Sequence, residues 1–184
     1  MGAQEHRELS VSNGGEPTVS AIARGFVGNA GEYFVLAELI RRGWTAALTA
    51  RNNRAFDILA KRDEYFAAIR VKAKTSGSTG FQWNAKPDGV IFLDMTWEHD
   101  FCALVDIPDK EDDGPTYYIV PTRVIDEWLK DDIHIFFTKP GAKGQQRATD
   151  NRRRVFHVDD HTDRLGHGYR QKLAPYKGAW HLLG

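Results

Sequence analysis

The sequence predicts a mixed α/β fold in which a central β-sheet is flanked by helices. Three observations predict it: an amphipathic helical pattern near the N-terminus, two β-rich runs joined by a charged turn, and further apolar runs followed by a second helical segment. This order is typical of a mixed sheet and fits a fully parallel, doubly wound sheet less well. The chain of 184 residues is expected to form a single domain over residues 21–184, behind a flexible leader at residues 1–20.

The first helix is predicted in the segment GNAGEYFVLAELIRRGW, residues 28–44. Its apolar side chains recur at the spacing of one helix face: they are Tyr33, Val35, Leu36, Leu39 and Ile40. Arg41 and Arg42 suit the negatively polarised C-terminal end of a helix, and Gly43 is a common terminator. Glu32 therefore stands on this helix beside a stripe that is expected to be buried.

A β-hairpin is the next predicted element, after a short strand at residues 45–49 and a loop, ARNNRA, at residues 50–55. Two β-rich runs, AFDILAKR and YFAAIRVKAK, flank the charged turn of this hairpin. Asp57 is expected within its first strand. Arg70 and Lys72 alternate with apolar residues on the second strand, so both project from one face.

The second half of the chain is expected to complete the sheet. Strands are predicted at residues 89–95, 101–107, 116–120 and 133–139. A helix is expected at residues 123–130 with Thr122 as its cap, and a short helix broken at Pro175 near the C-terminus. Residues 141–154 predict a basic loop that either is solvated or contacts a nucleic-acid backbone, and the solvated state is favoured slightly.

Several other residues admit both a functional and a structural interpretation, and the structural one is favoured for each. Phe81 and Trp83 suit core packing better than stacking on an unpaired base. Cys102 lies in the apolar run FCALV, which favours a buried thiol over a nucleophile. Three histidines mixed with aspartates lack a metal-binding spacing, so a second metal site is disfavoured: they are His157, His161 and His167.

The composition excludes several classes of protein. With 41% hydrophobic residues the chain is too apolar for a disordered protein. No apolar run approaches the roughly 20 residues that cross a membrane, and the N-terminus lacks a secretory signal, so a cytoplasmic protein is expected. The 25 basic and 25 acidic residues balance, so no global positive charge attracts nucleic acid. The sequence contains no Walker phosphate loop, dinucleotide-binding glycine pattern or nucleophile elbow.

Glu32, Asp57 and Lys72 supply the side-chain types that phosphodiester hydrolysis needs. Carboxylate oxygens are preferred protein ligands of Mg²⁺. A bound metal ion polarises the phosphate and lowers the pKa of its water, and a lysine helps to orient or activate that water. The structural alternative is a solvated helix end beside an edge hairpin, and residue spacing alone discriminates weakly between the two.

These segments together resemble the PD-(D/E)xK nuclease superfamily, particularly its restriction-endonuclease-like and Holliday-junction-resolvase-like members. In that pattern a helix bearing Gly-Glu precedes a strand bearing Asp, and the next strand carries an acidic residue or Gln, any residue, then Lys. The resemblance covers about residues 28–75 and matches Glu32, Asp57 and Lys72 to the catalytic positions. It implies a restriction-endonuclease-like mixed central sheet flanked by helices.

The resemblance also implies a DNA endonuclease that depends on Mg²⁺ or Mn²⁺, with RNA as a further candidate substrate and a homodimer as a candidate assembly. Glu32 and Asp57 would hold the metal ion, and Lys72 would position the attacking water. Four nearby basic residues are candidates for substrate contacts: Arg51, Arg54, Arg70 and Lys74.

Arg70 departs from the family pattern, because it stands where the family carries Glu, Asp or Gln. A guanidinium is always charged, so it offers no oxygen to a metal ion and repels a dication. Two functions therefore stay open: a nuclease in which Arg70 binds a phosphate, and a catalytically degenerate nuclease fold that serves as a nucleic-acid- or protein-binding module. A protein-interaction domain with no nucleic-acid role is a third hypothesis.

Overall fold

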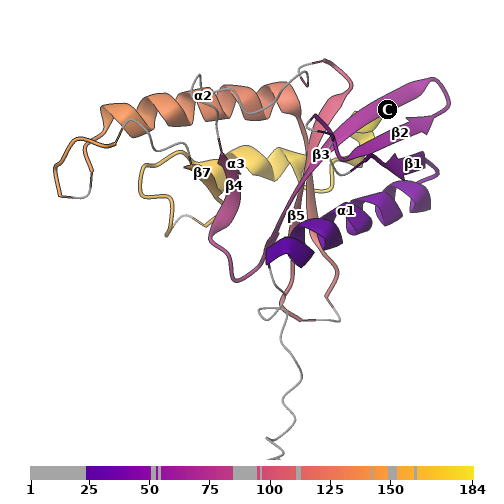
Figure 1. The fold of residues 1–184 in the computed structure, drawn as a ribbon, viewed down its shortest axis with the longest axis horizontal. Helices are drawn as coiled ribbons and strands as arrows, with labels where there is room; N and C mark the ends of the chain where they lie inside the picture. The colour runs from indigo at the N-terminus through magenta and orange to yellow at the C-terminus, as the bar shows by residue number, and fades with distance from the viewer. Residues whose placement is uncertain are drawn as a thin grey trace, which may run out of the picture.

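A five-stranded mixed sheet forms the centre of the fold, with the strand order β1-β2-β3-β5-β6 (Figure 1). The computed structural model describes residues 24–50, 53, 55–84, 95, 97–110, 113–141, 143–148, 153–159 and 161–184. In the central sheet β3 and β5 run parallel, and the other neighbouring strands are antiparallel. A smaller antiparallel sheet pairs β4 with β7. The predicted class, a mixed α/β fold with a central sheet flanked by helices, is confirmed.

The helices and strands follow one another in the predicted order as far as residue 75, and the strand at Gly80–Asn84 was not predicted. Their bounds are α1 (Arg24–Arg41), β1 (Thr45–Leu48), β2 (Ile58–Arg62), β3 (Tyr65–Thr75), β4 (Gly80–Asn84), β5 (Asp100–Ile107), β6 (Thr116–Pro121), α2 (Thr122–Thr138), β7 (Arg153–His157), α3 (Tyr169–Leu173) and two 3₁₀ turns, η2 (Ala174–Tyr176) and η3 (Trp180–Leu183). None of the helices in the described part of the chain has the length and apolarity that crossing a membrane requires.

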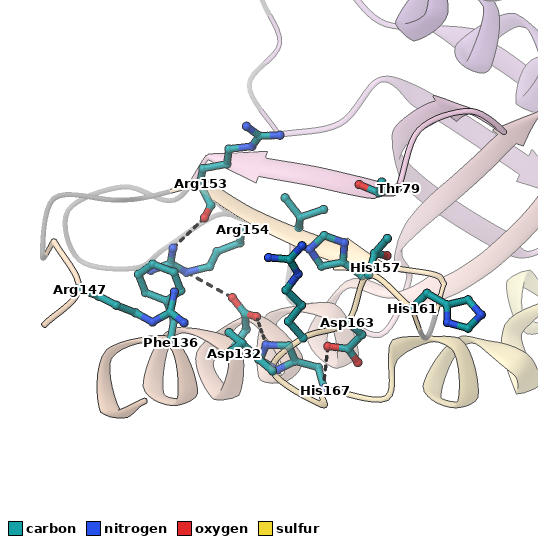
Figure 2. Close-up of a pocket in the computed structure, with 14 residues that line it drawn as sticks. Thr79, Asp132, Phe136, Arg147, Arg153, Arg154, His157, His161, Asp163 and His167 are labelled. Carbon is teal, nitrogen blue, oxygen red and sulfur yellow. Dashed lines mark hydrogen bonds and ion pairs between the residues drawn. The ribbon is translucent and has the colours of Figure 1, made fainter. Parts of the chain in front are cut away.

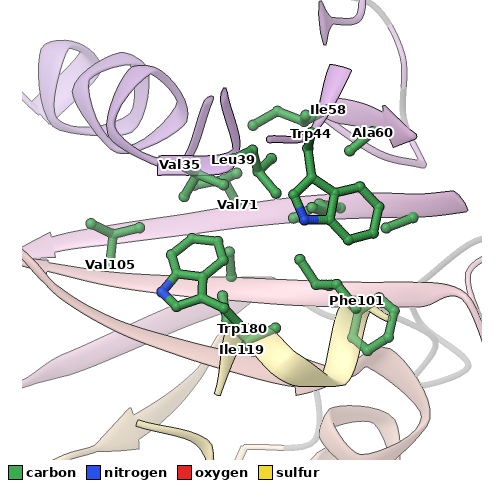
Figure 3. Close-up of a cluster of buried hydrophobic side chains, with 14 of the residues drawn as sticks. Val35, Leu39, Trp44, Ile58, Ala60, Val71, Phe101, Val105, Ile119 and Trp180 are labelled. Atoms are coloured by element: carbon green, nitrogen blue, oxygen red, sulfur yellow. The ribbon is translucent and has the colours of Figure 1, made fainter. Parts of the chain in front are cut away.

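Helix α1 covers one face of the central sheet. Its Val35 and Leu39 are fully buried, and they pack with Ile58 of β2 and Val71 of β3 in one hydrophobic cluster (Figure 3). Trp180 from the C-terminal 3₁₀ turn joins the same cluster. Burying an aliphatic side chain of this size stabilises a fold by about 1.5–3 kcal/mol. The position of α1 over the sheet is therefore set by its apolar stripe.

A second hydrophobic cluster lies against the opposite face of the sheet. It joins Cys102 and Leu104 of β5 to Ile125 and Leu129 of α2. The other buried members come mainly from the small sheet and α3, and they include Phe81, Trp83, Phe156, Tyr169 and Leu173. Phe81 and Trp83 are 1% and 2% exposed, so the prediction that they pack in the core is confirmed. Cys102 is also buried, as predicted.

Several predicted elements agree with the structure. The strand at residues 45–49 is β1, the hairpin is β2 and β3 in antiparallel pairing, and the strands at 101–107 and 116–120 are β5 and β6. The broken C-terminal helix is confirmed as α3 followed by the 3₁₀ turn that contains Pro175. The predicted leader at residues 1–20 lies outside the described residues, and so does the predicted strand at 89–95 apart from Met95.

The predicted strand at residues 133–139 is wrong, because α2 continues from Thr122 to Thr138. No glycine or proline interrupts the segment before Pro140, so nothing ends the helix earlier. Its buried residues follow a helical spacing along one face: Thr122, Ile125, Leu129 and Asp132. An apolar run such as IHIFFTK suits either state locally, and packing against the second cluster selects the helix.

Three smaller predictions also need correction. Thr122 is the first residue of α2 rather than its cap, and its hydroxyl donates to the carbonyl of Asp100 over 3.2 Å. Asp57 stands immediately before β2 instead of within it. The predicted basic loop at 141–154 ends in a strand, because Arg153 and Arg154 begin β7 and pair with β4. Arg154 is only 3% exposed, so this part of the segment is not a solvated loop.

Candidate active site

Glu32 and Asp57 line the same pocket, which lies where the N-terminal half of α1 passes the ends of β1 and β2. The pocket has a volume of about 350 Å³, and its other lining residues are Asn29, Tyr33, Leu48, Thr49 and Ala50. Two carboxylates that are far apart in the sequence therefore face one polar cavity. The structure brings these two predicted site residues together.

The close approach of α1 to β3 places Glu32 at this pocket. Gly31 is buried, and a Cβ atom added to it would lie 2.4 Å from the Cβ of Ala73 and 3.5 Å from Val71 Cγ1. A side chain at position 31 would thus push the helix away from the strand. Glycine inside a helix costs about 1 kcal/mol relative to alanine, so the residue is present for packing and not for helix stability.

Asp57 is held in place by main-chain and side-chain hydrogen bonds. Its N–H donates to the carbonyl of Ile69 over 2.9 Å, and its carbonyl accepts the N–H of Thr49 over 2.9 Å. The carboxylate Oδ2 accepts the N–H of Val71 over 2.7 Å. The turn before Asp57 is ordered by Asn53, whose Oδ1 accepts the N–H of Ala55 over 2.9 Å. The carboxylate is therefore preorganised at the junction of three strands.

Arg70 lies against Asp57. Its Nε is 3.5 Å from Asp57 Oδ2, and its Nη1 donates to the carbonyl of Ala55 over 3.3 Å. The side chains of Arg70 and Asp57 are 28% and 20% exposed, so the ion pair is reachable from solvent. Arg70 thus places a guanidinium beside the carboxylate at the position where the family pattern has a metal ligand or Gln.

Lys72 shares the sheet face of Arg70 and is partly buried, but it is not among the residues that line the pocket of Glu32 and Asp57. Burial is the main reason that its pKa lies below the ordinary value of 10.5, and the positive charge of Arg70 lowers the pKa further. The nearby Asp57 opposes this shift. Lys72 therefore lies within electrostatic range of both members of the ion pair.

The remaining predicted substrate contacts divide into two groups. Lys74 is 5% exposed, and its Nζ is 2.7 Å from Asp106 Oδ2 on the adjacent strand β5. Its ammonium is therefore held inside the fold by a carboxylate and is not placed to contact a substrate. Arg51 and Arg54 lie outside the described residues.

The donor set of the pocket fits a Mg²⁺ ion that keeps most of its waters. Two carboxylates with substrate oxygens are a usual protein environment for Mg²⁺. Both side-chain contacts of Asp57 use Oδ2, so Oδ1 is the oxygen that a metal ion would take. Within the described residues no group of three or more His, Cys, Asp or Glu side chains is placed to hold a metal, so none of the described carboxylates adds a third ligand to Glu32 and Asp57.

Sequence reasoning missed the residues that position the two carboxylates. Gly31 sets the distance between α1 and β3, and Asn53 and Thr49 hold the turn before Asp57, where Thr49 Oγ1 donates to the carbonyl of Phe56 over 2.8 Å. A glycine in the middle of an amphipathic helix, next to a glutamate, was the available signal for the first. The available signal for the turn before Asp57 was Asn53, because an asparagine side chain commonly accepts the N–H of the residue two positions later.

Two nucleases are among the solved structures to which this structure is similar. Over 87% of this chain and 90% of the other, the structure is similar to the bacterial homing endonuclease I-Ssp6803I, with 15% sequence identity and a TM-score of 0.46. It is also similar to Hjc, the Holliday junction resolvase of Archaeoglobus fulgidus, over 48% of this chain and 74% of the other, with 17% identity and a TM-score of 0.29.

No model of a protein family matches the sequence, and no curated protein matches it either.

Proposed function

We propose that the chain hydrolyses phosphodiester bonds of DNA at the pocket of Glu32 and Asp57. The observation that carries the proposal is the convergence of these two carboxylates, from α1 and from the turn before β2, on one cavity of about 350 Å³. A basic pair on β3, Arg70 and Lys72, lies beside Asp57. Carboxylates for a hard metal ion next to cationic groups for a phosphate are the arrangement that this reaction requires.

Glu32 and Asp57 Oδ1 are the proposed ligands of Mg²⁺ or Mn²⁺, which when bound polarises the scissile phosphate and lowers the pKa of water. Asp57 keeps its orientation because Val71 N–H holds its other oxygen at 2.7 Å. Lys72 is the proposed group that positions the attacking water, and its lowered pKa brings its neutral form closer to physiological pH. Arg70 is proposed to donate to a phosphate oxygen of the DNA.

Plasmid nicking tests this proposal. Purified wild-type protein is expected to relax supercoiled DNA with Mg²⁺ or Mn²⁺, and Lys72→Ala to abolish the activity. Lys110→Ala is the matched control, because Lys110 is an exposed lysine outside the site and its loss should leave cleavage unchanged. Equal activity of wild type and Lys72→Ala would assign the cleavage to another site or to a contaminant.

The ion pair between Arg70 and Asp57 favours a second candidate function, a nucleic-acid- or protein-binding module that has lost catalysis. In this candidate the guanidinium, 3.5 Å from Asp57 Oδ2, replaces the metal ion as the partner of the carboxylate. Arg70→Gln is then expected to strengthen Mn²⁺ binding, because it removes a positive charge and supplies an amide oxygen. Isothermal titration calorimetry of both proteins distinguishes the candidates, since strong Mn²⁺ binding by the wild type, lost in Asp57→Asn, contradicts the binding-module candidate.

A further inference from the structure

A second pocket, of about 500 Å³, lies between α2, β7 and the segment that follows β7 (Figure 2). None of its lining residues lines the pocket of Glu32 and Asp57. Its permanently charged lining residues are Arg147, Arg153, Arg154, Arg164, Asp132 and Asp163. Four arginines therefore face two aspartates, so these six side chains together carry a net charge of +2.

The two aspartates are already engaged by the protein. Asp132 Oδ2 is 3.3 Å from Arg154 Nε, and its Oδ1 is 2.9 Å from His167 Nε2. Asp163 uses one oxygen to accept the N–H of His167 over 3.0 Å and the other to accept the N–H of Gly168 over 2.7 Å. Figure 2 shows Asp132 between Arg154 and His167. The carboxylate of Asp163 is thus directed at main-chain amides and orders the loop that leads into α3. It forms no ion pair with an arginine of the described residues.

Arg147 is fixed in place by an aromatic ring and two main-chain carbonyls. Its guanidinium carbon lies 4.4 Å from the ring centroid of Phe136, its Nε donates to the carbonyl of Lys139 over 2.9 Å, and its Nη2 donates to the carbonyl of Pro140 over 3.3 Å. The Nη1 edge of the guanidinium is therefore the one that would bind a phosphate. The guanidinium carbon of Arg154 lies 4.5 Å from the same ring, so two positive groups are held beside one aromatic side chain. Arg164 is exposed. Neither Arg147 nor Arg164 forms an ion pair with any acidic residue that the structure describes.

His157 adds a buried polar atom to the same pocket. Its Nδ1 is shielded from solvent and has no hydrogen-bond partner in the described part of the chain. Burial lowers the pKa of His157, so the imidazole is neutral at neutral pH. A buried polar atom without a partner is costly, and a ligand oxygen or a bound water would relieve that cost.

We propose that this pocket binds a phosphate group, with Arg147 and Arg164 as the side chains that recognise it. Guanidinium groups offer two parallel N–H donors that match the oxygens of a phosphate. A phosphate monoester carries a charge of about −1.5 to −2 at neutral pH, so the two positive charges of Arg147 and Arg164 compensate it. The phosphate comes either from a small phosphate ester or from the backbone of a DNA strand. The inference does not depend on cleavage at Glu32 and Asp57.

Two binding measurements test the proposal on the full-length chain. The pocket variant is Arg147→Gln/Arg164→Gln, and the matched control is Lys110→Gln/Arg123→Gln, which removes two exposed positive charges outside the pocket. Calorimetric titration with inorganic phosphate is expected to show at least tenfold weaker binding by the pocket variant than by the wild type or the control. Fluorescence anisotropy of a labelled DNA duplex over a range of salt concentrations is the second measurement.

The duplex measurement identifies the source of the phosphate. If the pocket holds backbone phosphates, the slope of log K against log salt concentration falls by about 2 in the pocket variant and by less in the control. An unchanged slope with lost phosphate binding assigns the pocket to a small phosphate ester. The proposal is overturned if inorganic phosphate binding and the duplex slope are both the same in the pocket variant and the control.

A single-residue variant guards against misfolding of the double variant. Arg164 is exposed, so Arg164→Gln is expected to keep the circular dichroism spectrum and unfolding midpoint of the wild type. This variant should weaken phosphate binding in the same direction. Because these readouts measure binding and not nicking, failure of the proposed nuclease activity and failure of the phosphate pocket are separate results.

Discussion

Gly31→Ala perturbs the contact that places Glu32 beside Asp57. The added Cβ would lie 2.4 Å from the Cβ of Ala73, whereas carbon atoms in favourable contact are about 3.5–4.0 Å apart. Helix α1 must therefore move away from β3 by roughly 1 Å at this point. Overpacking of this kind costs about 1–3 kcal/mol, and the better helix propensity of alanine offsets about 1 kcal/mol of it. We expect a net loss of up to about 2 kcal/mol in the free energy of unfolding.

The same displacement is expected to reduce DNA cleavage more than it reduces stability. A misplacement of a catalytic group by 1 Å lowers a rate by about 100-fold, so we expect nicking by Gly31→Ala to fall by about that factor under conditions where the protein stays folded. Urea denaturation gives the stability change, and plasmid nicking gives the rate. Mn²⁺ affinity, measured by calorimetry, is expected to fall as well, because the two proposed ligands move apart.

Gly28→Ala is the matched control on the same helix, since nothing lies within 4 Å of a Cβ added to Gly28. It is expected to gain up to about 1 kcal/mol of stability from helix propensity and to keep full activity. A second variant, Gly31→Ala/Ala73→Gly, removes the carbon that the new methyl group meets and should recover most of the activity. If Gly31→Ala behaved like Gly28→Ala in both assays, the close approach of α1 to β3 would not be what positions Glu32.

Three further predictions concern buried ionisable groups. Lys72→Met is expected to raise stability at pH 7 while abolishing cleavage, because the folded state disfavours the charged lysine. The pKa of Lys72 in the folded state lies below 10.5, so the stability of the wild type should rise with pH in the interval below 10.5, and the stability difference between Lys72→Met and the wild type, measured by urea unfolding, should shrink there. A stability difference that does not change with pH would contradict this. Asp132→Asn is expected to cost about 3–5 kcal/mol in the same assay, because it removes the negative charge that lies 3.3 Å from Nε of the buried Arg154, and a loss below about 1 kcal/mol would show that this ion pair contributes little to stability. Burial raises the pKa of Cys102 to about 12, so the thiol should resist alkylation at pH 8 in the native protein and react once urea unfolds it. Rapid alkylation of Cys102 in the native protein would contradict its burial.

Local patterns in the sequence predict the first half of the fold well. The apolar stripe of α1, the charged turn between β2 and β3, and the alternation around Arg70 and Lys72 each depend on a few neighbouring residues, so their periodicity is visible without the tertiary structure. The same patterns predict the chemical types at Glu32, Asp57 and Lys72. The resemblance to the PD-(D/E)xK pattern, and not the local periodicity, singles out Arg70 as the departure that bears on catalysis.

Tertiary packing decides what the local patterns leave open. The run at residues 133–139 suits a strand or a helix by itself, and contact of α2 with the second hydrophobic cluster makes it helical. Lys74 alternates with apolar residues on β3 just as Lys72 does, so the sequence does not distinguish the two lysines. In the structure Asp106 of the neighbouring strand β5 pairs with Lys74 and holds it inside the fold. Such partners come from segments far along the chain, so no local pattern contains them.

The two carboxylates illustrate the same division. The sequence predicts correctly that Glu32 lies on a helix, but it places Asp57 inside the first strand of the hairpin, whereas that strand begins one residue later at Ile58. Whether they face one pocket depends on how closely α1 packs on β3, and this distance is set by the absence of a side chain at Gly31 opposite Ala73. The pocket lined by Arg147, Arg154 and Arg164 likewise forms only when α2, β7 and the segment after β7 fold together, because each contributes only part of its lining.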